Sequence, residues 1–347
     1  MARKAYCTLE ALEEIFDDPV THADLYHILR DYHDVVLNLP EEDLELEILQ
    51  NQYLRTLCKR GVYQLAGETN FYECLPEEFM ACTAGGLFIL DESPAVCADL
   101  STRYGACVLS LRDPAPSHTL THHYYRQMAH QDSFTESSPT GSSPTDIPAT
   151  SARQGWPALL APMGRLPMNS LLLVDNYLFT NLHEGRKNLL SLLDGLLPPR
   201  LDVEFHLLLV TTNPRNVLSP AVLADLFDQI RTHLNRPYPL LLGLLTHGGQ
   251  DRRFHRRAWV SNYHFGSSDR GFVCFDEQGR VKAHNDIRVQ GAFRDARTPY
   301  SDVPWRSMVL ELQSAAALRL HNEQLGGLMA TNLLYGNCNN RLLQLVN

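Results

Sequence analysis

Positive charge is concentrated in one short segment of an otherwise acidic chain. The stretch RRFHRRAWVSN, residues 252–262, holds four arginines and one histidine in its first six residues, whereas the 347-residue chain has a formal net charge of -10. In a β-strand, side chains two positions apart lie on the same face, so His255 and Arg257 would face one ligand together. The segment predicts an anion-binding site. Its positive charge would come from Arg252, Arg253, Arg256 and Arg257.

The same segment resembles the H-x-K-x4-D motif of the phospholipase D superfamily. His255, Arg257 and Asn262 have the spacing of that motif, and a Gly-Ser pair follows at 266–267. The resemblance implies a mixed sheet covered by helices and a site that needs no metal and no cofactor. It also implies that the histidine attacks phosphorus, that the basic residue holds phosphate, and that the third residue positions the site. The histidine of a second motif copy would then protonate the leaving group.

The chain departs from this motif in two positions. Arginine replaces lysine at 257, asparagine replaces aspartate at 262, and the sequence contains no second copy. Catalysis would therefore require a homodimer that joins two copies of His255, acting as a metal-independent phosphodiesterase or nuclease. The departures favour a non-catalytic module that binds nucleic acid or an acidic protein partner within a multi-protein assembly. A third interpretation is a solvated edge strand, whose charges prevent strand pairing and bind no ligand.

Polar residues follow three apolar segments in the second half of the chain. Asp175 and Asn176 follow LLLV at 171–174, Thr211, Thr212 and Asn213 follow a second apolar run, and His247 ends a third. Apolar strands separated by helical segments predict parallel βαβ units, and ligands collect beyond the carboxyl ends of such strands. We therefore expect these six residues to line one rim and to contribute to ligand binding. The alternative is that they are turn and helix-cap residues.

The pattern along the chain predicts an α/β protein in three parts. Residues 1–130 are expected to form a small acidic α/β domain with a helical start, including helices over 21–39 and 40–61. Residues 131–154 are rich in Ser, Thr and Pro and predict a disordered linker. Residues 155–347 predict an α/β domain that closes with one long helix over 304–334, and the motif resemblance implies that this domain is phospholipase D-like.

Charge and composition exclude several function classes. Residues 1–130 hold 9 basic and 21 acidic side chains, so a polyanion site belongs in the second half. His118 and His122 have a metal-ligand spacing, but they lack acidic or cysteine neighbours and the eight cysteines form no C-x-x-C pair, so no metal site is predicted. The apolar runs are too short to span a membrane, and the N-terminus lacks the features of a signal peptide. These features predict a cytoplasmic protein.

Overall fold

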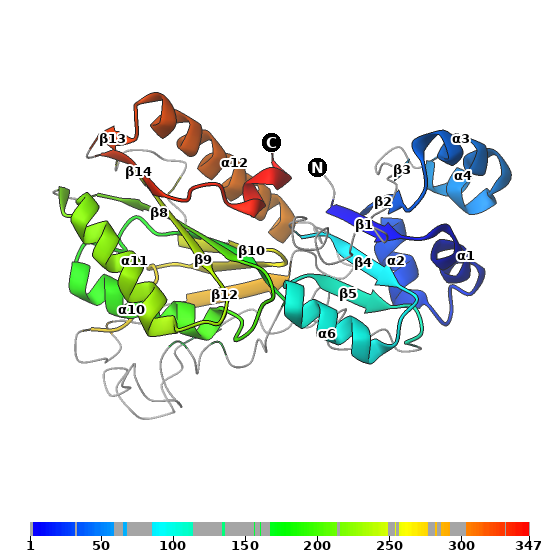
Figure 1. The fold of residues 1–347 in the computed structure, drawn as a ribbon, viewed down its shortest axis with the longest axis horizontal. Coiled ribbons are helices and arrows are strands. Elements are labelled where there is room, and N and C mark those ends of the chain that lie inside the picture. The colour runs from blue at the N-terminus through cyan, green and yellow to red at the C-terminus, as the bar shows by residue number, and fades with distance from the viewer. Residues whose placement is uncertain are drawn as a thin grey trace.

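The chain forms two β-sheets that are each flanked by helices, which confirms the expected α/β class (Figure 1). The computed structural model describes residues 3–31, 33–58, 65–67, 85–113, 134–135, 156, 160, 167–213, 216–248, 254, 257–276, 282, 286–291, 303–329 and 331–346.

The first sheet, sheet A, is parallel throughout and has the strand order β3-β2-β1-β4-β5. Thr8 and Ser93 cap the helices that follow β1 and β4, because their hydroxyl oxygens accept hydrogen bonds from Ala11 N and Val96 N. The strands are β1 (Arg3–Cys7), β2 (His33–Leu37), β3 (Leu65–Gly67), β4 (Leu87–Leu90) and β5 (Cys107–Ser110). The helices are α1 (Leu9–Asp17), α2 (Ala23–Asp31), α3 (Glu41–Gln50), α4 (Gln52–Cys58) and α6 (Pro94–Tyr104).

Three expectations for this half are corrected. The described chain begins with strand β1 rather than with a helix. The helix expected over 21–39 ends at Asp31, and its last part is strand β2, whose Val35, Val36 and Leu37 are buried in the sheet. The helix expected over 40–61 is divided at Asn51, whose carboxamide oxygen accepts hydrogen bonds from Tyr53 N and Leu54 N and so starts a second helix.

The second sheet, sheet B, is mixed, with the order β13-β14-β9-β8-β7-β10-β11-β12-β6. Strands β7, β8 and β9 are parallel, which confirms the predicted βαβ units. Their bounds are β7 (Ser170–Val174), β8 (Phe205–Thr212) and β9 (Leu240–His247), and those of the other strands are β6 (Phe134–Thr135), β10 (Arg257–Ser261), β11 (His264–Ser268), β12 (Asp286–Gly291), β13 (Leu328–Met329) and β14 (Asn332–Gly336). The helices are α10 (Leu182–Leu196), α11 (Pro220–Leu234), α12 (Val303–Gln324) and the 3-10 helix η6 (Arg341–Leu345).

Helices cover both faces of sheet B (Figure 1). Successive side chains of β7 alternate between the two layers: Leu171 and Leu173 join the cluster with α10 and α11, whereas Leu172 and Val174 join the cluster with α12. All four are fully buried. A strand that is apolar on both faces is expected where helices cover both sides of a sheet.

Two expectations for the second half are also corrected. The long closing helix ends at Gln324, because Gly326 and Gly327 follow with positive φ angles of 78° and 67° and turn the chain into the antiparallel pair β13–β14. Strand β6 lies within the segment expected to be a disordered linker and pairs with β12. The rest of residues 131–154 lies outside the described residues.

The two sheets are joined at the turn between β10 and β11. The buried hydroxyl of Tyr263 donates to Gly86 O and accepts from Cys107 N, both at 2.7 Å, so it bonds the amino ends of β4 and β5. Nearby, Asn169 Nδ2 donates to Tyr104 O at 2.9 Å. One hydrophobic cluster contains residues of both sheets. The amino ends of the two sheets therefore meet.

We expect Tyr263→Phe to lower the free energy of unfolding by about 2 kcal/mol, because Gly86 O and Cys107 N would lose their partner in a buried place. Urea unfolding followed by circular dichroism measures this difference. Tyr177→Phe is the matched control, since the Tyr177 side chain is 55% exposed. Equal stability of the two variants would contradict the role assigned to the Tyr263 hydroxyl.

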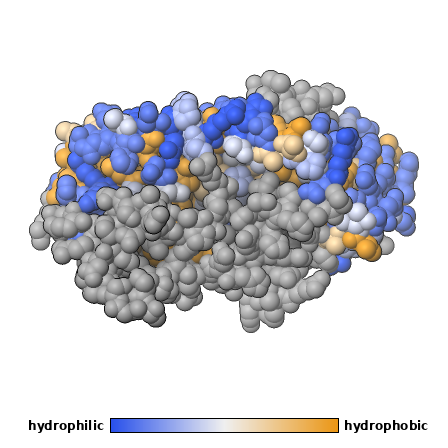
Figure 2. Space-filling view, turned by 90° about the horizontal axis from the view of Figure 1, so that it is seen from below, coloured by the Kyte–Doolittle hydropathy of each residue, from blue (hydrophilic) through white to orange (hydrophobic). Residues whose placement is uncertain are grey.

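The described surface is mainly polar. Figure 2 shows hydrophilic residues over most of the described part of one face, with apolar residues in small patches. No helix in the described ranges is both long enough and apolar enough to cross a bilayer.

Candidate functional site

Four of the predicted site residues lie together at the carboxyl edge of sheet B. Asp175 and Asn176 follow β7 directly, and Thr212 and His247 are the last residues of β8 and β9. Thr212 and His247 are register partners, and Val174 pairs with Val210 two residues before Thr212. The parallel register thus brings the ends of three strands to one rim, as the sequence predicts.

Asn176 connects the three strands at this rim. His247 Nε2 lies 2.8 Å from Asn176 Oδ1, and Thr212 Oγ1 donates to Asn176 O at 2.5 Å. His247 Nδ1 lies 2.9 Å from Gly248 O, so both ring nitrogens have polar neighbours that fix the orientation of the imidazole. The polar groups of the rim are therefore held in place before any ligand binds.

Asp175 has a structural role at the same edge. Its carboxylate is fully buried and accepts hydrogen bonds from Tyr177 N at 2.9 Å and from Phe272 N at 2.7 Å. The backbone at Gly271, which has a φ of 101°, lies close to this carboxylate. A Cβ at Gly271 would lie 2.8 Å from Asp175 Oδ2. Burial raises the pKa of Asp175, although the two backbone hydrogen bonds and the charge of Arg257 act against this. Asp175 therefore fixes the loop around Phe272 rather than offering its oxygens to a ligand.

Arg257 reaches the rim from the opposite direction. It is the first residue of β10, which runs antiparallel to β7 with Ala258 opposite Val174. Its Nη1 donates to Asp269 O at 2.8 Å, and its guanidinium carbon lies 5.0 Å from the centre of the Tyr177 ring. Its Nε is buried and has no hydrogen-bond partner among the described residues. The guanidinium is thus held at the rim with donor capacity left over.

Asn262 lies at the other end of the same strand. Its Oδ1 accepts from Asn169 N at 2.9 Å and from Ser170 N at 3.0 Å, and its Nδ2 donates to Asn169 Oδ1 at 2.9 Å. It comes five positions after Arg257, which is a span of about 16 Å in an extended chain. The structure therefore does not bring Arg257 and Asn262 into one site, and Asn262 fixes the start of β7.

The remaining predicted residues, Arg252, Arg253, His255 and Arg256, lie outside the described residues. Phe254, in the middle of this run, is fully buried, and its ring centre lies 4.7 Å from that of His247. The arginine-rich run thus meets the rim at its two described positions, Phe254 and Arg257.

Several residues of the rim were not predicted from the sequence. Tyr177 stacks on Arg257, and the Asp269 carbonyl accepts from it. Thr211, by contrast, is one of the residues predicted at the rim, and its fully buried hydroxyl has no hydrogen-bond partner in the described part of the chain. Tyr177 follows the DN pair directly in the sequence, which is the one local signal that could have identified it. Within the described ranges, no group of three or more His, Cys, Asp or Glu side chains is placed to hold a metal ion.

Comparison with known proteins adds no assignment, since no family model and no curated protein matches the chain.

Proposed function

We propose that the carboxyl edge of sheet B is the phosphate-binding surface of a non-catalytic, phospholipase D-like module, and that its ligand is a nucleic acid. The observation that carries the proposal is the convergence of Arg257, His247 and Thr212, from three different strands, on one rim. Arg252, Arg253 and Arg256 are close to Arg257 in the sequence and add positive charge to the same segment.

The chemistry of the rim suits a phosphate group. A guanidinium presents a planar set of N–H donors that matches two phosphate oxygens, and the Arg257 guanidinium lies at this rim. Arg257 is also held from two sides, by the Tyr177 ring and the Asp269 carbonyl, so little side-chain freedom would be lost on binding. The acidic first half of the chain repels a polyanion, which leaves this edge as the favoured place for one.

The position of Asn262 supports a binding function over catalysis. In the motif that the segment resembles, the third residue belongs to the catalytic site, whereas here the Asn262 side chain makes three hydrogen bonds with Asn169 and Ser170. A homodimeric phosphodiesterase with His255 as nucleophile would have to work without that residue. Phosphodiesterase activity is therefore one of the outcomes that the nucleic-acid binding experiment distinguishes.

We expect Arg257→Ala to weaken nucleic-acid binding by about tenfold and to reduce the salt dependence by about one phosphate contact. The measurement is fluorescence anisotropy of the full chain with labelled single-stranded and double-stranded DNA over a salt series. Arg200→Ala is the matched control, because Arg200 is exposed and lies in the segment that leads to the amino end of β8. Arg257→Lys should fall between the wild type and Arg257→Ala.

Other outcomes would contradict the proposal in distinct ways. Equal binding by Arg257→Ala and Arg200→Ala would remove the rim from the nucleic-acid surface. Binding to polyglutamate but not to DNA would point to an acidic protein partner instead. Degradation of the probe without added metal, lost in His255→Ala, would establish the phosphodiesterase.

A further inference from the structure

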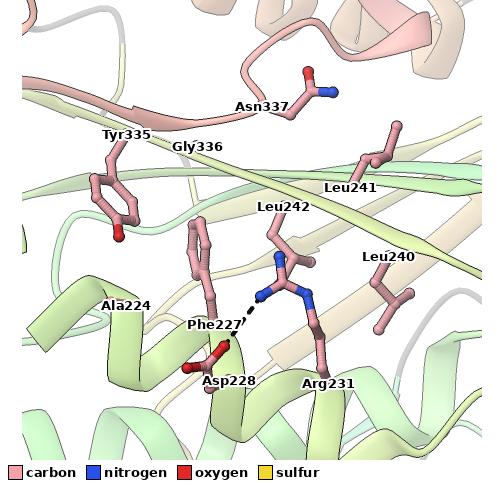
Figure 3. Close-up of a pocket in the computed structure, with 10 residues that line it drawn as sticks. All are labelled: Ala224, Phe227, Asp228, Arg231, Leu240, Leu241, Leu242, Tyr335, Gly336 and Asn337. Carbon is pink, nitrogen blue, oxygen red and sulfur yellow. Dashed lines mark hydrogen bonds and ion pairs between the residues drawn. The ribbon is translucent and has the colours of Figure 1, made fainter. Parts of the chain in front are cut away.

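A pocket of about 290 Å³ opens between α11 and the edge formed by β9 and β14 (Figure 3). On β9 it is lined by Leu240, Leu241 and Leu242, which begin the strand, whereas His247 ends it. The pocket and the candidate phosphate rim therefore lie at different ends of β9 and form separate sites.

Two residues that line the pocket, Gly336 and Ala224, have little or no side chain. Gly336, with φ of 73°, ends β14 so close to its neighbours that a Cβ there would lie 2.7 Å from Phe227 Cε2 and would collide with Leu242 O. On the facing helix, Ala224 lines the pocket one turn before Phe227. Ala224 therefore lines the pocket with a methyl group alone, whereas Gly336 lets β14 pack closely against Phe227 and Leu242.

The floor of the pocket is apolar and partly aromatic. Phe227 and Leu242 are buried, with 4% and 3% exposure, and they form adjoining walls. The ring of Tyr335 lies 5.3 Å from that of Phe227, at an angle of 56°. A flat apolar ligand would meet aromatic surface here in the tilted geometry that aromatic rings prefer.

One side of the pocket carries a cation. Arg231 lines the pocket from α11, and its guanidinium lies beside Leu242 in Figure 3. Within the described part of the chain it pairs with Asp228, 3.3 Å away on the same helix, and these side chains are 50% and 78% exposed. An exposed pair at this spacing is weak, so the guanidinium can bind a second carboxylate.

We propose that this pocket binds a small aromatic carboxylic acid. The ring of the ligand packs on Phe227 and Leu242, and its carboxylate pairs with Arg231. The volume is near the lower end for small-molecule sites and suits one ring or two fused rings. The position of Arg231 at the mouth fixes the orientation, with the ring inside and the acid group toward solvent.

Isothermal titration of the full chain with phenylacetate and indole-3-acetate, each compared with its amide, tests the proposal. We expect the acid to bind about tenfold more tightly than the amide, because only the acid forms a charged pair with Arg231. Arg231→Gln should reduce the affinity for the acid to that for the amide. Ala224→Leu should fill the pocket and abolish the binding of both. Arg55→Gln, an exposed arginine of α4, is the control and should bind as the wild type does.

The result is decisive in either direction. Binding of neither acid by the wild type, equal affinity for acid and amide, or full affinity after Arg231→Gln would each overturn the proposal. Binding that survives Ala224→Leu, in protein with a wild-type circular dichroism spectrum, would place the ligand elsewhere.

Discussion

Asn262→Ala is expected to lower the free energy of unfolding by about 3 kcal/mol, because it leaves buried polar groups without partners. Asn169 N, Ser170 N and Asn169 Oδ1 all bond to the Asn262 side chain, which is 1% exposed. Urea unfolding followed by tryptophan fluorescence measures the loss. Ser267→Ala, in the neighbouring strand β11, serves as the control for a mild change in the same hairpin.

Asn262→Asp distinguishes this structural role from a catalytic one. The substitution restores the residue type of the phospholipase D motif, yet the introduced carboxylate would be buried with one oxygen facing Asn169 Oδ1. Burial and this oxygen would raise its folded-state pKa above the unfolded value of about 3.9. The ionised group would therefore destabilise the folded protein at pH 7, and the deficit would shrink as the pH falls toward 4. A gain of phosphodiesterase activity without loss of stability would contradict the structural assignment.

Gly266→Ala is expected to cost about 3 kcal/mol, because the added methyl group has no room in a closely packed core. Gly266 lies directly opposite Trp259 in the β10–β11 pair, and a Cβ there would overlap the indole ring. Trp259 cannot move away easily, since it is fully buried and its ring centre lies 5.4 Å from that of Phe272.

Gly248→Ala is the matched control for this prediction. A Cβ at Gly248 would meet no atom of the described residues within 4 Å. Thermal and urea unfolding of the two variants should therefore differ clearly, with Gly248→Ala close to the wild type. Equal stability of Gly266→Ala and Gly248→Ala would contradict the close packing of Trp259 against Gly266.

The parallel core of sheet B and its rim could be predicted from the sequence for physical reasons. The apolar runs that become β7, β8 and β9 are separated by helices with clear start signals, such as Ser219 before Pro220. Parallel strands of this kind share one carboxyl edge, so the residues after them must lie together. Asn176, Thr212 and His247 therefore lie where the pattern of apolar segments puts them.

The antiparallel part of the sheet could not be predicted in the same way. Whether Arg257 and Asn262 share a site depends on where β10 ends and on its register with β7, and neither is encoded in local spacing. Residues 33–37 have a helical apolar spacing with the residues before them, but their burial in sheet A makes them a strand. The turn at Gly326 and Gly327 lies within a long helical pattern of apolar residues, so that pattern predicts a continuous helix there.

The two sheets meet at their amino ends, and the two halves of the chain differ strongly in net charge. Sheet A and sheet B extend away from the Tyr263 junction to opposite sides of the molecule in Figure 1. Residues 1–130 carry a formal charge of -12 and the remaining residues one of +2, so the chain has a large dipole moment along this axis. In the field of a polyanion the molecule would rotate until its acidic half points outward. The approach would thus be oriented before contact, with the sheet B half leading.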